Sequence, residues 1–346
     1  GCTTTQAIHE QVSILRKLRI LYIYSSKTSS PGWLTAHPLV CEQVEWIPHG
    51  VEADGSIARI KAAMLIPHSL QQVDLIISGE YYLSIGVNLR LLLTGCKTPH
   101  VVWGLNQSRK LLRPPGLRWL VDRVFNRTTL AVTHSREESR LFQHLHQIPA
   151  SKFSFAPWGY DLPPIDATPF LADACPYVCL VGRNNRDMDT FTAAVQKAGV
   201  HGVIITASLP ADRRQSLVDQ GVEVFENLSF ERCLACLRDS LFSAVLLNDS
   251  QRGAGHITIV SAMMLGKAQV VSDASVIQDY VINGEHALNV PLADVDACAR
   301  AFSQLLNNPE LAAQMGQRGR AHALAHYTND AIARELLRVI HTVTHG

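Results

Sequence analysis

The sequence predicts an α/β fold with two domains, each built on a parallel β-sheet that helices cover on both faces. Short apolar runs recur along the chain, among them LRILYIYSS, VDLIISGE, YVCLVG and AQVVSD, and segments of helical length separate them. Continuous apolar strands are typical of parallel sheets that are buried on both faces. At 346 residues the chain also exceeds one ordinary core. Because open α/β sheets bind ligands beyond the carboxyl ends of their strands, we expect a cleft between the domains.

The predicted elements follow one another in regular alternation. Strands are expected over 18–26, 73–80, 99–106, 128–135 and 152–159, and then over 177–182, 202–208, 222–227, 243–249 and 268–273. A helix is expected over 56–72, and another begins at Ser135, which is a good N-cap because acidic residues follow it in the first turn. After 290 the sequence favours helices with little strand between them.

A proline-rich segment divides this alternation into two halves. Residues 157–176 carry five of the 16 prolines, which is typical of an interdomain linker. We therefore expect a first domain over residues 1–160, a linker over 161–176 and a second domain over 177–326. The last stretch, 327–346, predicts an amphipathic helix that packs back towards the first domain.

Composition restricts the class of protein. The formal net charge of +1 argues against a protein that holds nucleic acid by bulk electrostatics. Eight cysteines show no disulfide-framework spacing, which favours a reducing compartment. No apolar run is long enough to span a bilayer, and the start of the chain lacks the pattern of a signal peptide. We expect a cytoplasmic protein.

Cys233 and Cys236 form a C-x-x-C within FERCLACLRDSL. A zinc site would need four ligands, and no second pair stands at a suitable spacing. The segment instead predicts an amphipathic helix with both cysteines on its apolar face. We favour buried cysteines over a metal or redox site, and expect no metal elsewhere.

The segment LVGRNNRDMDTF presents two arginines, Arg183 and Arg186, in a loop between a strand and a helix. Guanidinium groups match phosphate oxygens, and the helix N-terminus that follows adds free N–H groups and a positive dipole. The alternative is that these arginines pair with Asp187 and Asp189 on the surface. Spacing alone leaves both interpretations open.

A second loop, RGAGHITIVSAMMLGKAQVV, contains Gly253 and Gly255 just before an apolar helix. Glycines at a helix N-terminus let backbone amides approach a phosphate closely, and His256 and Thr258 offer side-chain donors. A G-x-G by itself is also common in ordinary tight turns.

The order of these segments resembles the GT-B glycosyltransferases, particularly the retaining family 4. The motifs that carry the resemblance are VGRNNRDMD, GAGHITIVSAMMLGKAQVV, VINGEHALNVP and NNPELAAQMGQRGR, and they lie within residues 157–335. The resemblance implies two Rossmann-like α/β/α domains that face a central cleft. It further implies transfer of a sugar from a nucleotide-diphosphate donor to a hydroxyl acceptor, with retention, without a metal and without a further cofactor.

The resemblance also implies roles for individual residues. Arg183 matches an arginine that contacts the donor diphosphate, and Arg186 takes the place of a family lysine; both would stabilise the leaving group and are the catalytic candidates. The donor-binding residues that it implies are Gly182, Gly253, Gly255, His256, Ile257, Thr258 and Ser261.

The chain departs from the family at two positions. Family enzymes hold two glutamates eight positions apart, which contact the donor sugar and the ribose, but Gly253 and Ser261 stand there. A serine hydroxyl cannot replace an anionic carboxylate that accepts two hydrogen bonds from a ribose diol. Asp249 offers a substitute carboxylate, although a loop cap is the favoured interpretation. A degenerate GT-B protein that binds a partner or glycan without catalysis is therefore the alternative to an enzyme.

In the first domain the resemblance is looser, and loops after predicted strands supply the candidates. On the acceptor side they are Ser26, Lys27, Glu80 and Asn106. His134 could line the cleft or be an ordinary core histidine.

The run 108–127 alternates basic and apolar residues, including Trp119. Such a stretch can lie on an anionic membrane surface, which would make the protein peripheral, or pack its apolar stripe inward with a solvated basic face. The second interpretation is slightly favoured.

Overall fold

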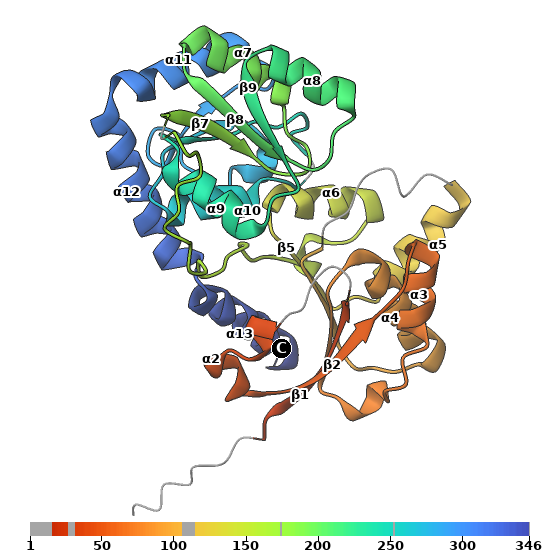
Figure 1. Cartoon of the computed structure of the whole chain (residues 1–346). Coiled ribbons are helices and arrows are strands. Elements are labelled where there is room, and N and C mark those ends of the chain that lie inside the picture. The colour runs from red at the N-terminus through yellow and green to blue at the C-terminus, as the bar shows by residue number, and fades with distance from the viewer. Residues whose placement is uncertain (1–15, 27–31, 106–114, 174, 252, 346) are drawn as a thin grey trace, which may run out of the picture.

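The computed structural model describes residues 16–26, 32–105, 115–173, 175–251 and 253–345. They form two six-stranded sheets, each parallel throughout, with helices on both faces (Figure 1). The predicted α/β fold class is confirmed. None of the helices in the described ranges is long and apolar enough to cross a bilayer.

The first sheet has the strand order β2-β1-β3-β4-β5-β6. Its strands are β1 (Leu18–Ser25), β2 (Val44–Val51), β3 (Leu75–Ser78), β4 (His100–Trp103), β5 (Leu130–Thr133) and β6 (Phe153–Phe155). Every residue of β3 and β5 is buried, which explains their continuous apolar sequences. The edge strand β2, which the sequence analysis did not predict, is buried only at its two ends, Val44 and Val51.

Helices α1 to α6 accompany this sheet. They are α1 (Gly32–Thr35), α2 (Pro38–Cys41), α3 (Ser56–Met64), α4 (Tyr81–Thr94), α5 (Pro115–Phe125) and α6 (Arg136–His146), with single 3-10 turns at Leu70–Gln72 and Ala150–Lys152. Ser135 caps α6 as predicted, because its side chain accepts a hydrogen bond from the backbone N–H of Glu138. The cap fixes where β5 ends and α6 begins.

The second sheet has the order β12-β11-β10-β7-β8-β9. Its strands are β7 (Tyr177–Val181), β8 (His201–Thr206), β9 (Val222–Glu226), β10 (Ser243–Val245), β11 (Gln269–Ser272) and β12 (Ala287–Val290). Its helices are α7 (Met188–Ala198), α8 (Ala211–Asp219), α9 (Phe230–Asp239), α10 (His256–Met264), α11 (Val295–Asn307) and α12 (Pro309–His326), with a 3-10 turn at Ser275–Ile277.

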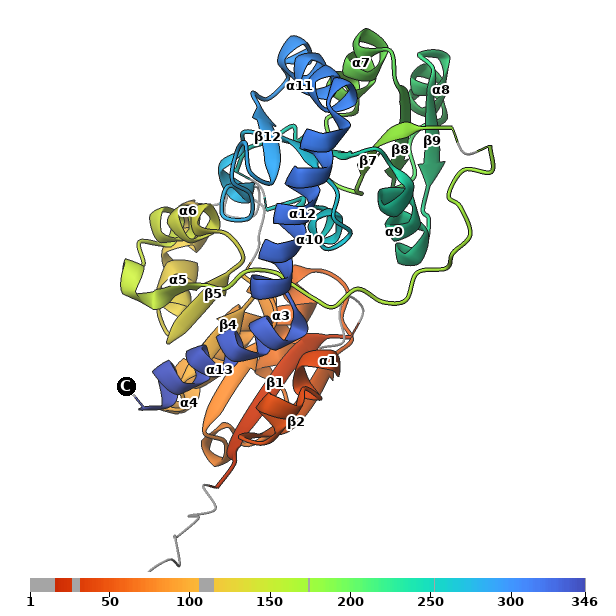
Figure 2. The ribbon, with the colours of Figure 1, turned by 90° about the vertical axis from the view of Figure 1, so that its left-hand side faces the viewer.

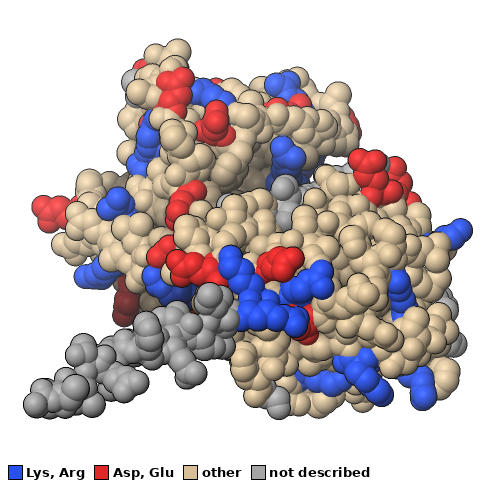
Figure 3. Space-filling model, turned by 90° about the horizontal axis from the view of Figure 1, so that it is seen from below, with Lys and Arg blue, Asp and Glu red and all other residues tan. Residues whose placement is uncertain are grey.

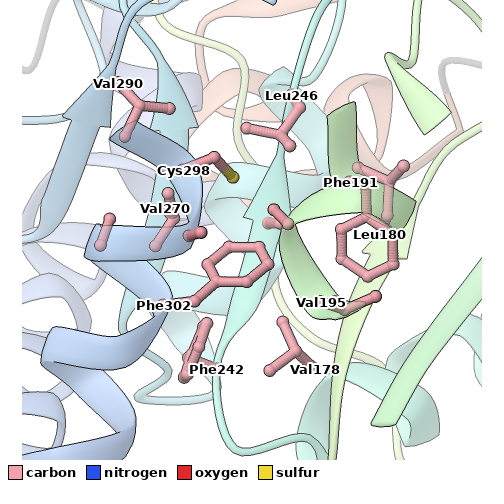
Figure 4. Close-up of a cluster of buried hydrophobic side chains, with 14 of the residues drawn as sticks. Val178, Leu180, Phe191, Val195, Phe242, Leu246, Val270, Val290, Cys298 and Phe302 are labelled. Carbon is pink, nitrogen blue, oxygen red and sulfur yellow. The ribbon is translucent and has the colours of Figure 1, made fainter. Parts of the chain in front are cut away.

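A hydrophobic core lies between this sheet and helices α7 and α11. Leu180 from β7 and Val270 from β11 point towards Phe191 of α7 and Phe302 of α11 (Figure 4). The rings of Phe191 and Phe302 meet edge to face with their centroids 6.0 Å apart. This packing makes the second sheet a rigid support for the loops at its carboxyl edge.

The last helix, α13 (Asn329–His345), leaves the second half of the chain and packs on the first sheet (Figure 2). Its buried residues include Leu336 and Ile340, which share one core with Ile20 of β1 and Leu75 of β3. The apolar face of α13 therefore covers the first sheet, and burial of that face holds the helix there.

The chain just before the linker passes close to the residues that lead into α13, and the Tyr160 N–H donates to the Tyr327 carbonyl (2.7 Å). A Cβ atom at Gly159 would overlap the backbone of Tyr327, so only glycine fits there. Beside it, Asp161 and Asn329 exchange backbone-to-side-chain hydrogen bonds of 3.2 and 2.9 Å. These contacts therefore hold together the two segments of the chain that connect its halves, one around Gly159 and one around Tyr327.

A buried polar chain runs through the first domain. His100 donates from Nδ1 to Asn88 Oδ1 (2.7 Å) and accepts at Nε2 from the Ser78 hydroxyl (2.8 Å), while the Asn88 amide donates to Thr128 Oγ1 (2.8 Å). The side chains of His100, Ser78 and Asn88 are completely buried. Burial is the main cause that lowers the pKa of His100 from 6.5 to about 3, so the ring is neutral in the folded protein.

We expect this histidine to make the fold sensitive to acid. Because its folded pKa lies below the unfolded value, the unfolded chain binds one more proton between about pH 6.5 and 3. The free energy of unfolding should therefore fall as the pH drops through that window, by up to about 1.4 kcal/mol per pH unit from His100 alone. Urea denaturation at pH 7.5, 6 and 5 measures the slope. The free energy of unfolding should depend less steeply on pH in a His100→Gln variant than in a variant at the exposed His144. Equal slopes in the two variants would contradict the assignment of the acid sensitivity to His100.

Charge is distributed in small mixed groups on the face seen from below. Basic and acidic side chains lie intermixed near its middle and leave wide uncharged areas between them (Figure 3). Opposite charges therefore offset each other over short distances on that face.

Candidate functional site

The strand order of the second sheet creates a crevice where its connections diverge. β7 pairs with β8 on one side and with β10 on the other, so the loops that follow β7 and β10 lead away in opposite directions. Ligands of open α/β sheets bind at such switch points. A cleft of about 660 Å³ lies here. The second-domain residues that the resemblance named as catalytic or donor-binding all line it, namely Gly182, Arg183, Arg186, Gly253, Gly255, His256, Ile257, Thr258 and Ser261.

Arg186 is buried beneath this cleft and holds its floor together. Its guanidinium donates to the carbonyls of Val181 (3.0 Å) and Asn184 (2.9 Å) and to Thr258 Oγ1 (3.2 Å). Thr258 in turn donates to the Val181 carbonyl, so β7 and the first turn of α10 are tied together. Burial lowers the pKa of Arg186 to about 10, which still leaves it charged at neutral pH.

Gly182 makes this position of Arg186 feasible. Its φ is +149°, in the region that favours glycine, and a Cβ atom there would overlap the Arg186 guanidinium. The glycine next to the arginine pair is therefore a steric requirement of the floor.

Arg183 takes the opposite orientation. It lines the cleft with an exposed side chain, and no described residue forms a hydrogen bond or ion pair with it. The alternative, that the arginines pair with neighbouring aspartates, is wrong for the described structure. Asp187 instead caps α7 through Thr190 (2.6 and 3.0 Å), and Asp189 pairs with Arg213 at 2.8 Å.

The N-terminus of α10 forms the opposite wall. Gly255 caps the helix with φ +91°, and its α-carbon approaches β10 so closely that a Cβ would stand 2.9 Å from Val245 Cγ1. The unpaired N–H groups of the first turn and the helix dipole add positive potential at the cleft. Asp249 does not reach the cleft lining; its carboxylate caps the loop at the Gln251 N–H (2.8 Å), as favoured from the sequence.

Two histidines approach the cleft from different halves of the chain. His256, the first residue of α10, donates from Nε2 to the Val276 carbonyl (2.8 Å) and stacks on Tyr280 with 4.6 Å between centroids. His134, after β5, donates from Nδ1 to the Ala156 carbonyl (2.9 Å). Burial lowers the pKa of both, that of His256 to about 4.

Aromatic and apolar side chains form the remaining wall. Tyr160 donates to Ser261 Oγ (2.6 Å), which itself donates to the Ile257 carbonyl (2.6 Å). The Tyr160 ring packs between Trp158 (5.0 Å) and the half-exposed Phe230 (5.7 Å between centroids). Sequence reasoning missed this wall because the residues that line it come from just before the linker and from the region around α9, namely Trp158, Leu228, Phe230, Leu234 and Leu237, with Tyr160 packed against them. The short aromatic run just before the linker is the signal that could have found part of it.

Two of the first-domain candidates, Ser26 and Glu80, lie at the switch point of their own sheet, after β1 and β3. Ser26 donates to the Val51 carbonyl (3.1 Å), and Glu80 pairs with Arg59 (3.2 Å). Neither is among the residues that line the cleft. Lys27 and Asn106 lie outside the described residues. The acceptor side stays a prediction.

The basic run 108–127 is described only in part, and its apolar residues differ in exposure. Residues 108–114 lie outside the described part of the chain. In α5, Val124 and Phe125 pack inward, whereas Trp119 is 67% exposed with Arg123 over its ring.

Cys236 is buried as expected, but Cys233 is half-buried and lines the cleft. No group of described residues could hold a metal ion.

Comparison with known proteins agrees with this geometry. Over residues 215–322 the sequence matches the model of the family described as Glycosyl transferases group 1. No curated protein sequence matches the chain. Over residues 215–322 this match agrees with the resemblance to the glycosyltransferases that the motifs predicted.

Solved structures share the fold across nearly the whole chain. Sucrose-phosphate synthase from Thermosynechococcus elongatus has a TM-score of 0.70 at 17% identity, covering 94% of this chain and 99% of its own. Anabaena HepE in complex with UDP has a TM-score of 0.70 at 14% identity, covering 94% and 100%. A UDP-forming trehalose-phosphate synthase from Burkholderia xenovorans has a TM-score of 0.68 at 12% identity, covering 94% and 99%. At these identities the likeness shows the fold.

Proposed function

We propose that the chain transfers a sugar from a nucleotide-diphosphate donor to a hydroxyl acceptor. The observation that carries the proposal is uncompensated positive charge in the cleft. Arg183 is exposed and unpaired, Arg186 lies beneath it, and no described carboxylate pairs with either. A buried cation without a partner is costly, so a ligand that supplies negative charge is the natural complement.

The two ends of the cleft differ in character, and each suits a different part of a nucleoside diphosphate. The diphosphate would meet Arg183 and the first turn of α10, where free N–H groups favour anions. The base would meet the apolar wall around Phe230, because an exposed aromatic ring offers a stacking surface. HepE, which shares the fold, has been solved with UDP and with UDP-glucose.

The chemistry would rest on stabilising the leaving group. As the sugar–phosphate bond breaks, negative charge develops on the diphosphate, and fixed positive groups around it lower the barrier. Arg183 would touch the diphosphate, whereas Arg186 would hold Thr258 and β7 in place and add charge from below. We propose retention of the anomeric configuration on the basis of the family resemblance.

Release of nucleoside diphosphate from sugar nucleotides tests the proposal. Wild-type protein is incubated with UDP-glucose, UDP-N-acetylglucosamine or GDP-mannose in the presence of EDTA, and free UDP or GDP is measured. We expect slow release from at least one donor, since water can replace the acceptor, and its loss in the Arg183→Ala variant.

The alternative function is a GT-B protein that binds without catalysis. The observation that favours it is the absence of aspartate and glutamate from the described lining of the cleft. Nucleotide binding without release of diphosphate from any donor, with or without added Mg²⁺, would support this alternative and contradict the enzyme.

A further inference from the structure

Two imidazole rings, His134 and His256, line the cleft, and a tyrosine fixes their relative position. Tyr280 stacks on His256 and donates its hydroxyl to the backbone carbonyl of His134 (2.6 Å). The same hydroxyl accepts the backbone N–H of Trp158 (2.8 Å). The two histidines therefore belong to one preorganised unit that spans the two halves of the chain.

Each ring is held in a defined tautomer. His134 uses Nδ1 to donate to Ala156, so its Nε2 carries a lone pair; His256 uses Nε2 to donate to Val276, so its Nδ1 carries the lone pair. No described residue bonds to either of these free nitrogens, and neither is sealed from solvent. Burial keeps both rings neutral at physiological pH by lowering the pKa. The cleft thus contains two fixed hydrogen-bond acceptors.

Because both free nitrogens are hydrogen-bond acceptors, the ligand group that they bind must be a hydrogen-bond donor. A lone pair repels a phosphate oxygen, so the free nitrogens are unsuited to the diphosphate. A hydroxyl donates a hydrogen bond, and a sugar carries several. The other hydroxyl groups of the lining are engaged, because Thr258 bonds to Arg186 and Val181, and Ser261 bonds to Ile257 and Tyr160. No aspartate or glutamate is among the described lining residues.

We propose that His134 and His256 accept hydrogen bonds from hydroxyl groups of the donor sugar and thereby determine which sugar the cleft takes. The inference rests on the proposed function, and it assigns sugar recognition to neutral imidazoles in a cleft without carboxylates. Because one histidine comes from each half of the chain, the sugar is held only while both halves enclose it.

The opposite tautomers allow a matched test. An asparagine amide stands where Nδ1 of histidine stands, and a glutamine amide stands where Nε2 stands. His256→Gln and His134→Asn therefore keep the donor to the backbone carbonyl and remove the free acceptor. His256→Asn and His134→Gln place a carbonyl oxygen at the free acceptor position. Each pair controls for loss of the ring itself.

The affinities of the wild type and the four variants are measured by calorimetry for UDP and UDP-glucose, or for GDP and GDP-mannose where the wild type binds the guanine nucleotide. The acceptor-removing variants should weaken binding of the sugar nucleotide roughly fivefold each, while affinity for the free diphosphate changes less than about twofold. The acceptor-keeping variants should stay near the wild type. Thermal unfolding of each variant confirms that it is folded.

Two results would contradict the inference, and a third would contradict the proposed function on which it rests. If the acceptor-removing variants weaken UDP and UDP-glucose binding equally, the histidines hold the cleft in shape without contacting the sugar. If all four variants bind the sugar nucleotide like the wild type, the free nitrogens have no role in recognition. If the wild type binds neither diphosphate, the proposed function itself is contradicted.

Discussion

The Gly182→Ala variant is expected to lower the free energy of unfolding by about 3 kcal/mol, because the new methyl group must occupy the space of a buried guanidinium. Arg186 would have to leave the carbonyls of Val181 and Asn184 and the hydroxyl of Thr258, and each would lose a charge-assisted partner. Urea denaturation followed by fluorescence measures the loss. Binding of UDP should weaken in the same variant, since the floor of the cleft moves.

Gly199→Ala is the matched control. Gly199 also has a positive φ, +67°, and lies in the same half of the chain, but no atom lies within 4 Å of the position that its Cβ would take. Its substitution should cost about 1 kcal/mol from backbone strain alone. If both variants lose the same stability, steric exclusion by Arg186 is not what requires the glycine.

The Arg183→Ala variant is expected to weaken binding of UDP or GDP by at least tenfold while leaving stability unchanged. Arg183 is exposed and makes no bond to a described residue, so the folded protein loses nothing when it is removed. A charge-assisted contact to a diphosphate contributes roughly 1.5–3 kcal/mol, which corresponds to about 10- to 100-fold in affinity. Calorimetric titration together with thermal unfolding measures both quantities.

Arg213→Ala serves as the comparison for Arg183→Ala, because it removes one arginine from the same half of the chain away from the cleft lining. Its nucleotide affinity should match that of the wild type. An equal loss of affinity in both variants would attribute the effect to overall charge, and an unchanged affinity in Arg183→Ala would remove this residue from the site.

The sequence predicted the central strands because burial on both faces leaves a direct mark on composition. β3 and β7 are apolar at almost every position, and both were expected. β2 and β12 were not expected, and each lies at the edge of its sheet, where polar residues are tolerated. The edge strands β6 and β9 were nevertheless expected, so the polar and turn-forming residues within β2 and β12, such as Pro48, Gly50 and Asn289, are what removed the local signal.

The second-domain side of the site was predicted further than the first-domain side. The loops around Gly182 and Gly255 converge because both follow neighbouring parallel strands of one sheet. Spacing could not say which arginine faces the cleft, because that depends on the space that Gly182 leaves for Arg186. The role of Tyr280 could also not be predicted from the sequence, because its contacts with His134 and His256 join residues far apart in the chain.

The central claim is that the cleft holds a diphosphate, and titration of the wild type with UDP and UMP, and with GDP and GMP, tests it most directly. The two members of each pair share the base and ribose and differ in the second phosphate. We expect the diphosphate to bind at least tenfold more tightly than the monophosphate, through Arg183 and the first turn of α10. Equal affinities within both pairs, or no binding of any of the four nucleotides, would contradict the account.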